Sequence, residues 1–266
     1  MAFTGQRLAA PVAAFALLAL AFAGGASADD VAPKDILAPS GKLRVGLYPG
    51  TPTSILQSAS EGPRGVGYDL GKELARQLGV PYEPVVFAKN AEVQAAVKTG
   101  AVDAAFTNAS AARAKEMDFG PAYLESDLGY LIGKDSKVGK PEDVDLKGIR
   151  VGVTASSSSD AAMSRDLKNA EVVRLATINE APAMLAAGNI DVFATNKATL
   201  FELAEKTPGG RILDGRWGVE RHAIAIPKGR DQGMVFVRKF TEDVKARGLV
   251  DAAIARSGLR AAQTAK

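Results

Sequence analysis

The stretch Leu43-Arg44-Val45-Gly46 returns later in the chain as Ile149-Arg150-Val151-Gly152. A second landmark follows each copy: Gly100-Ala101-Val102-Asp103 in the first half and Gly188-Asn189-Ile190-Asp191 in the second. Landmarks that repeat in the same order predict two lobes built on one plan. Motifs this short also match by chance, so a single undivided domain is the alternative.

Strand-like and helix-like runs alternate around the first copy. Helical spacing is clearest between 69 and 78, where leucines recur every four residues at Leu70, Leu74 and Leu78. We expect strands at 43–47, 85–87 and 102–106, with helices at 69–78 and 91–98. This alternation predicts an α/β fold.

Two further strand-like runs, 128–132 and 222–226, predict crossings between the lobes. The expected division is lobe one at 29–129 plus 226–266, and lobe two at 130–225. Helices between 230 and 258 would then pack on lobe one, and the tail after Gly258 is expected to fray. Two crossing strands make a hinge, which predicts a ligand cleft that opens and closes between the lobes.

Residues 1–28 differ in composition from the rest of the chain. They hold one charged residue, Arg7, then an apolar run at 11–23, and end in Ala26-Ser27-Ala28. This order is typical of a secretory signal peptide, here cleaved after Ala28. The alternative is a membrane anchor, but the apolar run is shorter than the roughly 20 residues that a span needs. The sequence therefore predicts export, with the periplasm as the destination.

Composition excludes several kinds of site. The chain has no cysteine and a single histidine, His222. Disulfides, thiolate metal sites, a cysteine-borne lipid anchor, Cys-His catalysis and multi-histidine metal sites are therefore excluded. The formal net charge of +3 is spread along the chain, which disfavours nucleic acid as a partner. We expect no cofactor, and a structural or surface role for His222.

Polar segments follow four of the predicted strands, where ligands of open α/β sheets sit. They are residues 48–51, 107–113, 154–159 and 195–196. Arg113 is the first candidate, because a guanidinium matches a carboxylate with two parallel hydrogen bonds. A surface arginine is the alternative. The serines at 156–159 are interpreted as a helix cap and ligand contact rather than a linker.

Several motifs together resemble one family. Gly67-Tyr68-Asp69-Leu70, residues 97–103, Arg113 through Tyr123, and Asp145-Leu146-Lys147-Gly148 are similar to stretches of the periplasmic substrate-binding proteins of polar amino-acid ABC transporters, bacterial extracellular solute-binding family 3. The resemblance covers about residues 42–260. It implies the type II periplasmic-binding-protein fold, with two lobes, two crossing hinge strands and the ligand between the lobes.

The resemblance also implies site residues. Arg113 would hold the ligand carboxylate with help from Asn108 and Ser110, opposite groups of lobe two. The other expected ligand contacts are Tyr48, Asn90, Thr154, Ser158, Ser159 and Asn196. Asn196 stands where the family usually has an aspartate that binds the ligand ammonium. Either the solute lacks an ammonium, or carbonyl groups and Tyr48 hold it.

The resulting hypothesis is a monomeric solute-binding component of an ABC importer. Its partners would be a small carboxylate or amino acid and a membrane permease. One alternative is an enzyme on the same fold, resembling cyclohexadienyl dehydratase, with Glu92 or Glu180 as acid or base. The other is a sensor protein whose closed form docks on a membrane receptor.

Overall fold

The strands of the chain form one sheet with the order β2-β1-β3-β9-β4-β7-β5-β6, and β8 and β10 both pair with β4. The structure is a computed structural model that describes residues 1, 2, 31–57 and 62–266. The predicted signal-peptide features between residues 3 and 28, and the cleavage site after Ala28, lie outside the described residues.

The strands are β1 Leu43–Leu47, β2 Tyr82–Val86, β3 Ala104–Asn108, β4 Met117–Ile132, β5 Arg150–Thr154, β6 Glu171–Leu175, β7 Val192–Asn196, β8 Arg211–Ile212, β9 Gly218–Pro227 and β10 Ala262–Thr264. The α-helices are α1 Pro33–Leu37, α2 Val66–Leu78, α3 Asn90–Thr99, α4 Ser158–Asp166, α5 Ala181–Ala186, α6 Lys197–Ala204, α7 Asp231–Ala246 and α8 Leu249–Ser257. The alternation of strands and helices confirms the predicted α/β fold.

The first half is built around β1, which pairs in parallel with β2 and β3. Leu43, Val45 and Leu47 are fully buried, and because alternate residues of a strand share a face, they form the core-facing side of β1. Helix α2 packs on this sheet through the predicted leucine stripe but begins at Val66, three residues before the predicted start. β3 also lies two residues later in the chain than predicted.

The repeated landmarks form the same structure in both halves. Arg44 donates from its backbone N and Nε to Asp103 Oδ2 over 3.0 and 2.9 Å, and from Nη2 to Oδ1 over 2.8 Å. Arg150 makes the same three bonds to Asp191 over 2.9, 3.0 and 3.0 Å. Each arginine begins a central strand and each aspartate ends the turn before its parallel neighbour. The repeat in the sequence therefore encodes a clasp between β1 and β3, and another between β5 and β7.

A glycine lies beside each clasp, where neighbouring side chains leave little room for a Cβ. A Cβ at Gly46 would lie 3.0 Å from Val93 and 3.2 Å from Val102, and one at Gly152 would lie 2.5 Å from the Cδ1 atom of Ile190. A larger residue at either position would therefore require these side chains to shift. The glycines of the two repeated motifs allow this close packing.

Strands β4 and β9 run antiparallel along the middle of the sheet. β4 pairs with β9 from Met117 to Leu128 and with β7 from Leu128 to Ile132. β9 also pairs with β3. The predicted crossing runs at 128–132 and 222–226 are thus parts of two longer strands. Separate hydrophobic clusters pack at the two ends of these strands, one around Leu70 and Phe240 and others around Val151 and Phe193.

The C-terminal tail corrects one prediction. Residues after Gly258 were expected to fray, but β10 pairs antiparallel with β4 from Ala262 against Ser126 to Thr264 against Leu124. Ala265 is buried, and its N–H donates to the Tyr123 carbonyl over 3.0 Å. An unpaired edge of β4 in this region offers free backbone groups, and the tail satisfies them.

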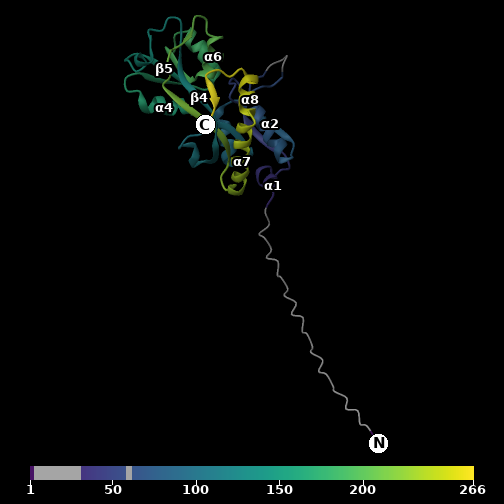
Figure 1. Cartoon of the computed structure of the whole chain (residues 1–266). Coiled ribbons are helices and arrows are strands. Elements are labelled where there is room, and N and C mark those ends of the chain that lie inside the picture. Colours follow the sequence, from purple (N-terminus) through teal and green to yellow (C-terminus); the bar gives the residue numbers. More distant parts are fainter. Residues whose placement is uncertain (3–30, 58–61) are drawn as a thin grey trace. The chain divides into compact units, whose positions relative to one another are not determined.

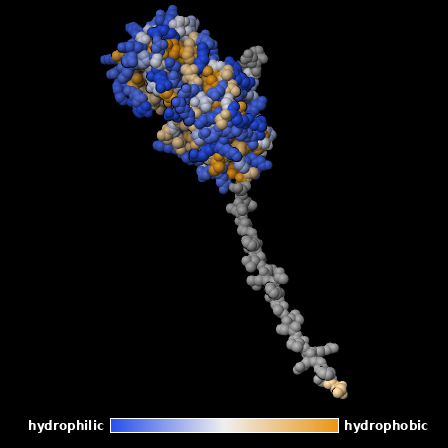
Figure 2. Space-filling model, in the orientation of Figure 1, coloured by the Kyte–Doolittle hydropathy of each residue, from blue (hydrophilic) through white to orange (hydrophobic). Residues whose placement is uncertain are grey.

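Figure 1 shows α2, α7 and α8 around one part of residues 32–266, and α4, α6 and β5 in another part, with β4 between them. Hydrophilic residues cover most of the visible face of this unit in Figure 2. Among the described residues, none of the helices has the length and apolar character that a membrane span requires.

Candidate functional site

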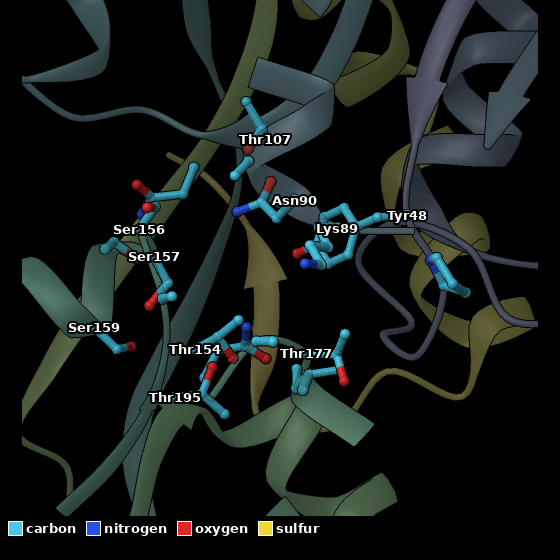
Figure 3. Close-up of a pocket in the computed structure, with 18 of the residues that line it drawn as sticks. Tyr48, Lys89, Asn90, Thr107, Thr154, Ser156, Ser157, Ser159, Thr177 and Thr195 are labelled. Atoms are coloured by element: carbon cyan, nitrogen blue, oxygen red, sulfur yellow. The ribbon is translucent and has the colours of Figure 1, made fainter. Parts of the chain in front are cut away.

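A cavity of about 240 Å³ lies where β1, β3, β5 and β7 end. All four polar segments singled out in the sequence contribute to its lining, together with the start of α3, residues 176–179 and strand β9. In Figure 3, Lys89, Asn90 and Thr107 lie across the cavity from Thr154, Thr177 and Thr195. The site is therefore assembled from both halves of the repeat.

Arg113 brings a buried cation to the cavity from the 3₁₀ turn Arg113–Lys115 that precedes β4. Its side chain is 8% exposed. Nη1 donates to Thr107 Oγ1 over 3.0 Å and to the Asn108 carbonyl over 2.9 Å. Burial lowers the pKa of Arg113. Among the described residues no carboxylate forms an ion pair with it, so Nε and Nη2 are available to a ligand.

The four serines form the start of a helix rather than a linker. Ser157 is the N-cap of α4, and its Oγ accepts a hydrogen bond from Asp160 N over 3.0 Å. Ser156 has a positive φ of 60°, which turns the chain sharply into the helix. Ser158 and Ser159 are then the first two helical residues, and their backbone N–H groups precede any intrahelical partner. This end of α4 favours negative charge in the cavity.

Asn196 is the N-cap of α6. Its Oδ1 accepts a hydrogen bond from Thr199 N over 2.9 Å. This bond uses one of the two lone pairs of the carbonyl oxygen. The amide Nδ2 of Asn196 also remains for a ligand, and it is a donor.

We expect Asn196→Ala to lower the free energy of unfolding by about 1 kcal/mol, because an N-cap acceptor of α6 is lost. Asn196→Ser should stay within a few tenths of a kcal/mol of the wild type, since a serine hydroxyl caps equally well. Urea denaturation of both variants measures the difference. Equal stability of the two variants would contradict the capping role.

Three buried polar atoms of residues that line the cavity have no hydrogen-bond partner among the described residues. They are Asn90 Oδ1, Asn108 Oδ1 and, on β9, His222 Nδ1. Buried polar groups normally find a partner. Beside them, burial raises the pKa of Tyr48 to about 12, so its hydroxyl is neutral. The wall thus offers acceptors and a hydroxyl around the buried guanidinium.

Glu220 and His222 add a carboxylate and an imidazole that sequence reasoning did not assign to the site. Both lie on β9, line the cavity and are buried. Glu220 Oε1 lies 2.8 Å from His222 Nε2. Glu220 Oε2 accepts from Asn108 Nδ2 over 3.1 Å and from Ser158 Oγ over 3.2 Å. One carboxylate therefore connects a strand of the first half to a helix of the second.

The structure brings eight of the nine predicted site residues to this cavity: Tyr48, Asn90, Asn108, Arg113, Thr154, Ser158, Ser159 and Asn196. Ser110 instead lines an adjoining cavity of about 520 Å³. Its Oγ accepts from Arg113 N over 3.3 Å, so it positions the turn that carries the arginine.

The candidate catalytic carboxylates lie elsewhere. Glu92 and Glu180 are exposed and do not line the cavity. Glu92 accepts from Ala88 N over 3.1 Å, and Glu180 accepts from Thr177 N over 2.9 Å. Both side chains hold the backbone at the start of a helix. The described residues also contain no cluster of three or more possible metal ligands.

Comparisons with known proteins point to one family. The family described as bacterial extracellular solute-binding proteins, family 3, matches residues 43–256. A glutamine-binding protein of Geobacillus stearothermophilus is 30% identical over 116 residues, and the chain spans less than half of its length, 44%. The glutamine-binding protein GlnH of Bacillus subtilis is 24% identical over 90% of this chain and 92% of its own.

A solved structure has the same fold. The amino acid ABC transporter substrate-binding protein AbpA of Streptococcus pneumoniae, bound to L-arginine, superposes with a TM-score of 0.75 at 23% identity. The match covers 84% of this chain and 97% of that one. The two-lobed periplasmic-binding-protein fold predicted from the sequence is thereby confirmed.

Proposed function

Because this chain belongs to the bacterial extracellular solute-binding proteins of family 3, we propose that it captures a small carboxylate-bearing solute for an ABC importer. The solute class is a polar amino acid or a related organic acid. The observation that carries the proposal is the buried guanidinium of Arg113, which has two donors left for a ligand and no carboxylate of the described chain paired with it.

The surroundings of Arg113 suit a carboxylate. Two hydrogen bonds to Thr107 and Asn108 fix Nη1, so the remaining edge of the guanidinium is held in one orientation. A carboxylate matches that edge with two parallel bonds. The start of α4 at Ser158 and Ser159 lies in the same cavity and adds a favourable helix dipole. The glutamine-binding relatives and the arginine-bound neighbour support a solute of amino-acid size.

Capture would occur by closure of two lobes, residues 29–129 plus 226–266 and residues 130–225. The strands between them, β4 and β9, would act as the hinge. Contacts across the proposed division support a closed form. Thr51 Oγ1 lies 2.8 Å from Thr199 Oγ1, and both residues are fully buried. Asn108 on the first lobe donates to Glu220 on the second, which also accepts from Ser158 of the second lobe.

The physiological setting follows from the family. We propose that the protein is exported to the periplasm, loses residues 1–28 and delivers its solute as a monomer to a membrane permease. The comparison with an ABC transporter substrate-binding protein supports a transport role over a sensor role.

A thermal-shift screen of amino acids, organic acids and amines tests the proposal. A ligand at about 100 times its Kd stabilises the native state by about 2.7 kcal/mol. For a domain of this size, that stabilisation raises Tm by roughly 5–10 °C. We expect such a rise with one or more carboxylates and none with the matching amines. Chemical conversion of the stabilising compound would contradict the carrier function and favour an enzyme.

A further inference from the structure

Glu220 is the one acidic residue among the described residues that line the cavity. It lies on β9, away from the start of α6, where Asn196 uses its carbonyl oxygen to cap the helix. Any negative charge that the protein itself contributes to this cavity therefore comes from β9.

The carboxylate of Glu220 is fixed but not fully used. Oε2 accepts two hydrogen bonds, from Asn108 and Ser158, whereas Oε1 has a single partner, His222. A carboxylate has about four acceptor positions, so Oε1 keeps one for another donor. Burial raises the pKa of Glu220, whereas the hydrogen bonds from His222 and Ser158 and the charge of Arg113 lower it. Three donors on the two oxygens favour the ionised carboxylate.

Charge balance indicates which ligand fits. Arg113 and Glu220 are both buried beside one cavity, one positive and one negative. A solute with only a carboxylate would neutralise Arg113 and leave Glu220 as an uncompensated buried charge, which is unfavourable. A solute that also carries a cation would neutralise both groups.

His222 is the other group that could compensate Glu220. Its ring approaches the carboxylate through Nε2, but Nδ1 is buried and has no partner among the described residues. An imidazolium would place a buried N–H without an acceptor at Nδ1, whereas a neutral ring leaves only a lone pair there. The geometry therefore favours a neutral donor to Glu220 over a permanent counterion.

We infer that Glu220 is the counter-charge for a cationic nitrogen of the solute, and that the solute is a zwitterion with a carboxylate on Arg113 and an ammonium on Glu220. This inference rests on the proposed function. It makes Glu220 a specificity-determining residue, because a solute without the cation would be rejected.

The test measures binding by calorimetry to the purified wild-type protein, Glu220→Gln and Glu92→Gln. The twenty standard L-amino acids are screened first. The tightest binder is then compared with its deaminated counterpart, in which hydrogen replaces the ammonium. We expect the wild type to prefer the amino acid by at least about 100-fold. Glu220→Gln should lose this preference because it binds the amino acid more weakly. Its Kd for the deaminated acid should stay within about fivefold of the wild-type Kd for that acid.

Glu92→Gln is the control for the loss of one carboxylate. Glu92 lies outside the cavity, so Glu92→Gln should keep the wild-type preference. If the wild type binds the deaminated acid as tightly or more tightly, or if Glu220→Gln keeps the preference, this inference is wrong while the carrier function stands. If the wild type binds no amino acid and no organic acid, the proposed function itself fails. A merely structural role for Glu220 would lower the affinity for both compounds equally.

Discussion

Arg113→Ala is expected to weaken solute binding by about 2–5 kcal/mol, or roughly 30- to 5,000-fold in Kd. The arginine is 8% exposed, so the ligand carboxylate that it pairs with is removed from water on binding. Without the guanidinium that carboxylate is desolvated and has no cation to compensate it. Calorimetry with the solute found by thermal shift measures the loss.

Two further variants make the result specific. Arg113→Lys should also bind poorly, because an ammonium is a point charge and cannot form two parallel bonds. Lys89→Ala removes an exposed cation that lines the same cavity, and it should change Kd by less than about fivefold. Unchanged affinity in Arg113→Ala, with the unliganded Tm close to that of the wild type, would exclude Arg113 from the site.

Asp103→Ala should lower the free energy of unfolding by about 3 kcal/mol. Asp103 is fully buried and accepts from two arginines, Arg44 over 2.8 Å and Arg230 over 3.1 Å. Its removal leaves both guanidinium groups largely out of water without their anion. The side chains of Arg44 and Arg230 keep 24% and 17% exposure, which places the loss at the lower end of the range for buried pairs. Urea denaturation at neutral pH measures it.

The second clasp provides the matched comparison. Asp191 makes the same three bonds to Arg150, but its side chain is 22% exposed and that of Arg150 is 36% exposed. Partly hydrated ion pairs contribute less to stability. Asp191→Ala should therefore cost about 1 kcal/mol. If the two variants lost equal stability, the deeper burial of Asp103 would add nothing to its contribution, and the prediction would be wrong.

The repeat in the sequence predicted the duplicated fold because each motif encodes a local clasp. An arginine at the start of one strand and an aspartate in the turn before the neighbouring parallel strand come to the same end of the sheet in any such unit. That the two side chains bond to each other, as Arg44 and Asp103 do, is a tertiary fact. The repeated motifs therefore predicted the architecture, whereas the arginine–aspartate interaction that explains the motifs could be seen only in the structure.

The site was predicted where local motifs determine it. Arg113 and the serines of α4 follow directly from strand ends and a helix start. Glu220 was missed, although alternation along β9 places it on the same face as His222. Which way that face points depends on Asn108 and Ser158, which lie 112 and 62 residues away in the sequence. The residues next to Glu220 in the sequence do not predict that packing.

Two other differences have the same origin. The role of Asn196 depends on its rotamer, since its carbonyl oxygen accepts from Thr199 N and caps α6. The tail beyond Gly258 is short, and its order comes from the open edge of β4 that it covers. Hydrogen-bond partners determine both features, and the periodicity of hydrophobic residues along the chain carries no information about such partners.

The contact between Glu220 and the lone imidazole also provides an intrinsic spectroscopic probe of the cavity. Because His222 is the single histidine of the sequence, a nuclear magnetic resonance spectrum of the untagged protein contains one set of imidazole carbon-bound proton signals. Those signals need no assignment, and they come from a ring whose Nε2 lies 2.8 Å from Oε1 of the carboxylate in the cavity. Titrating a solute while following that one resonance would record occupancy of the site directly, without a label or a mutation.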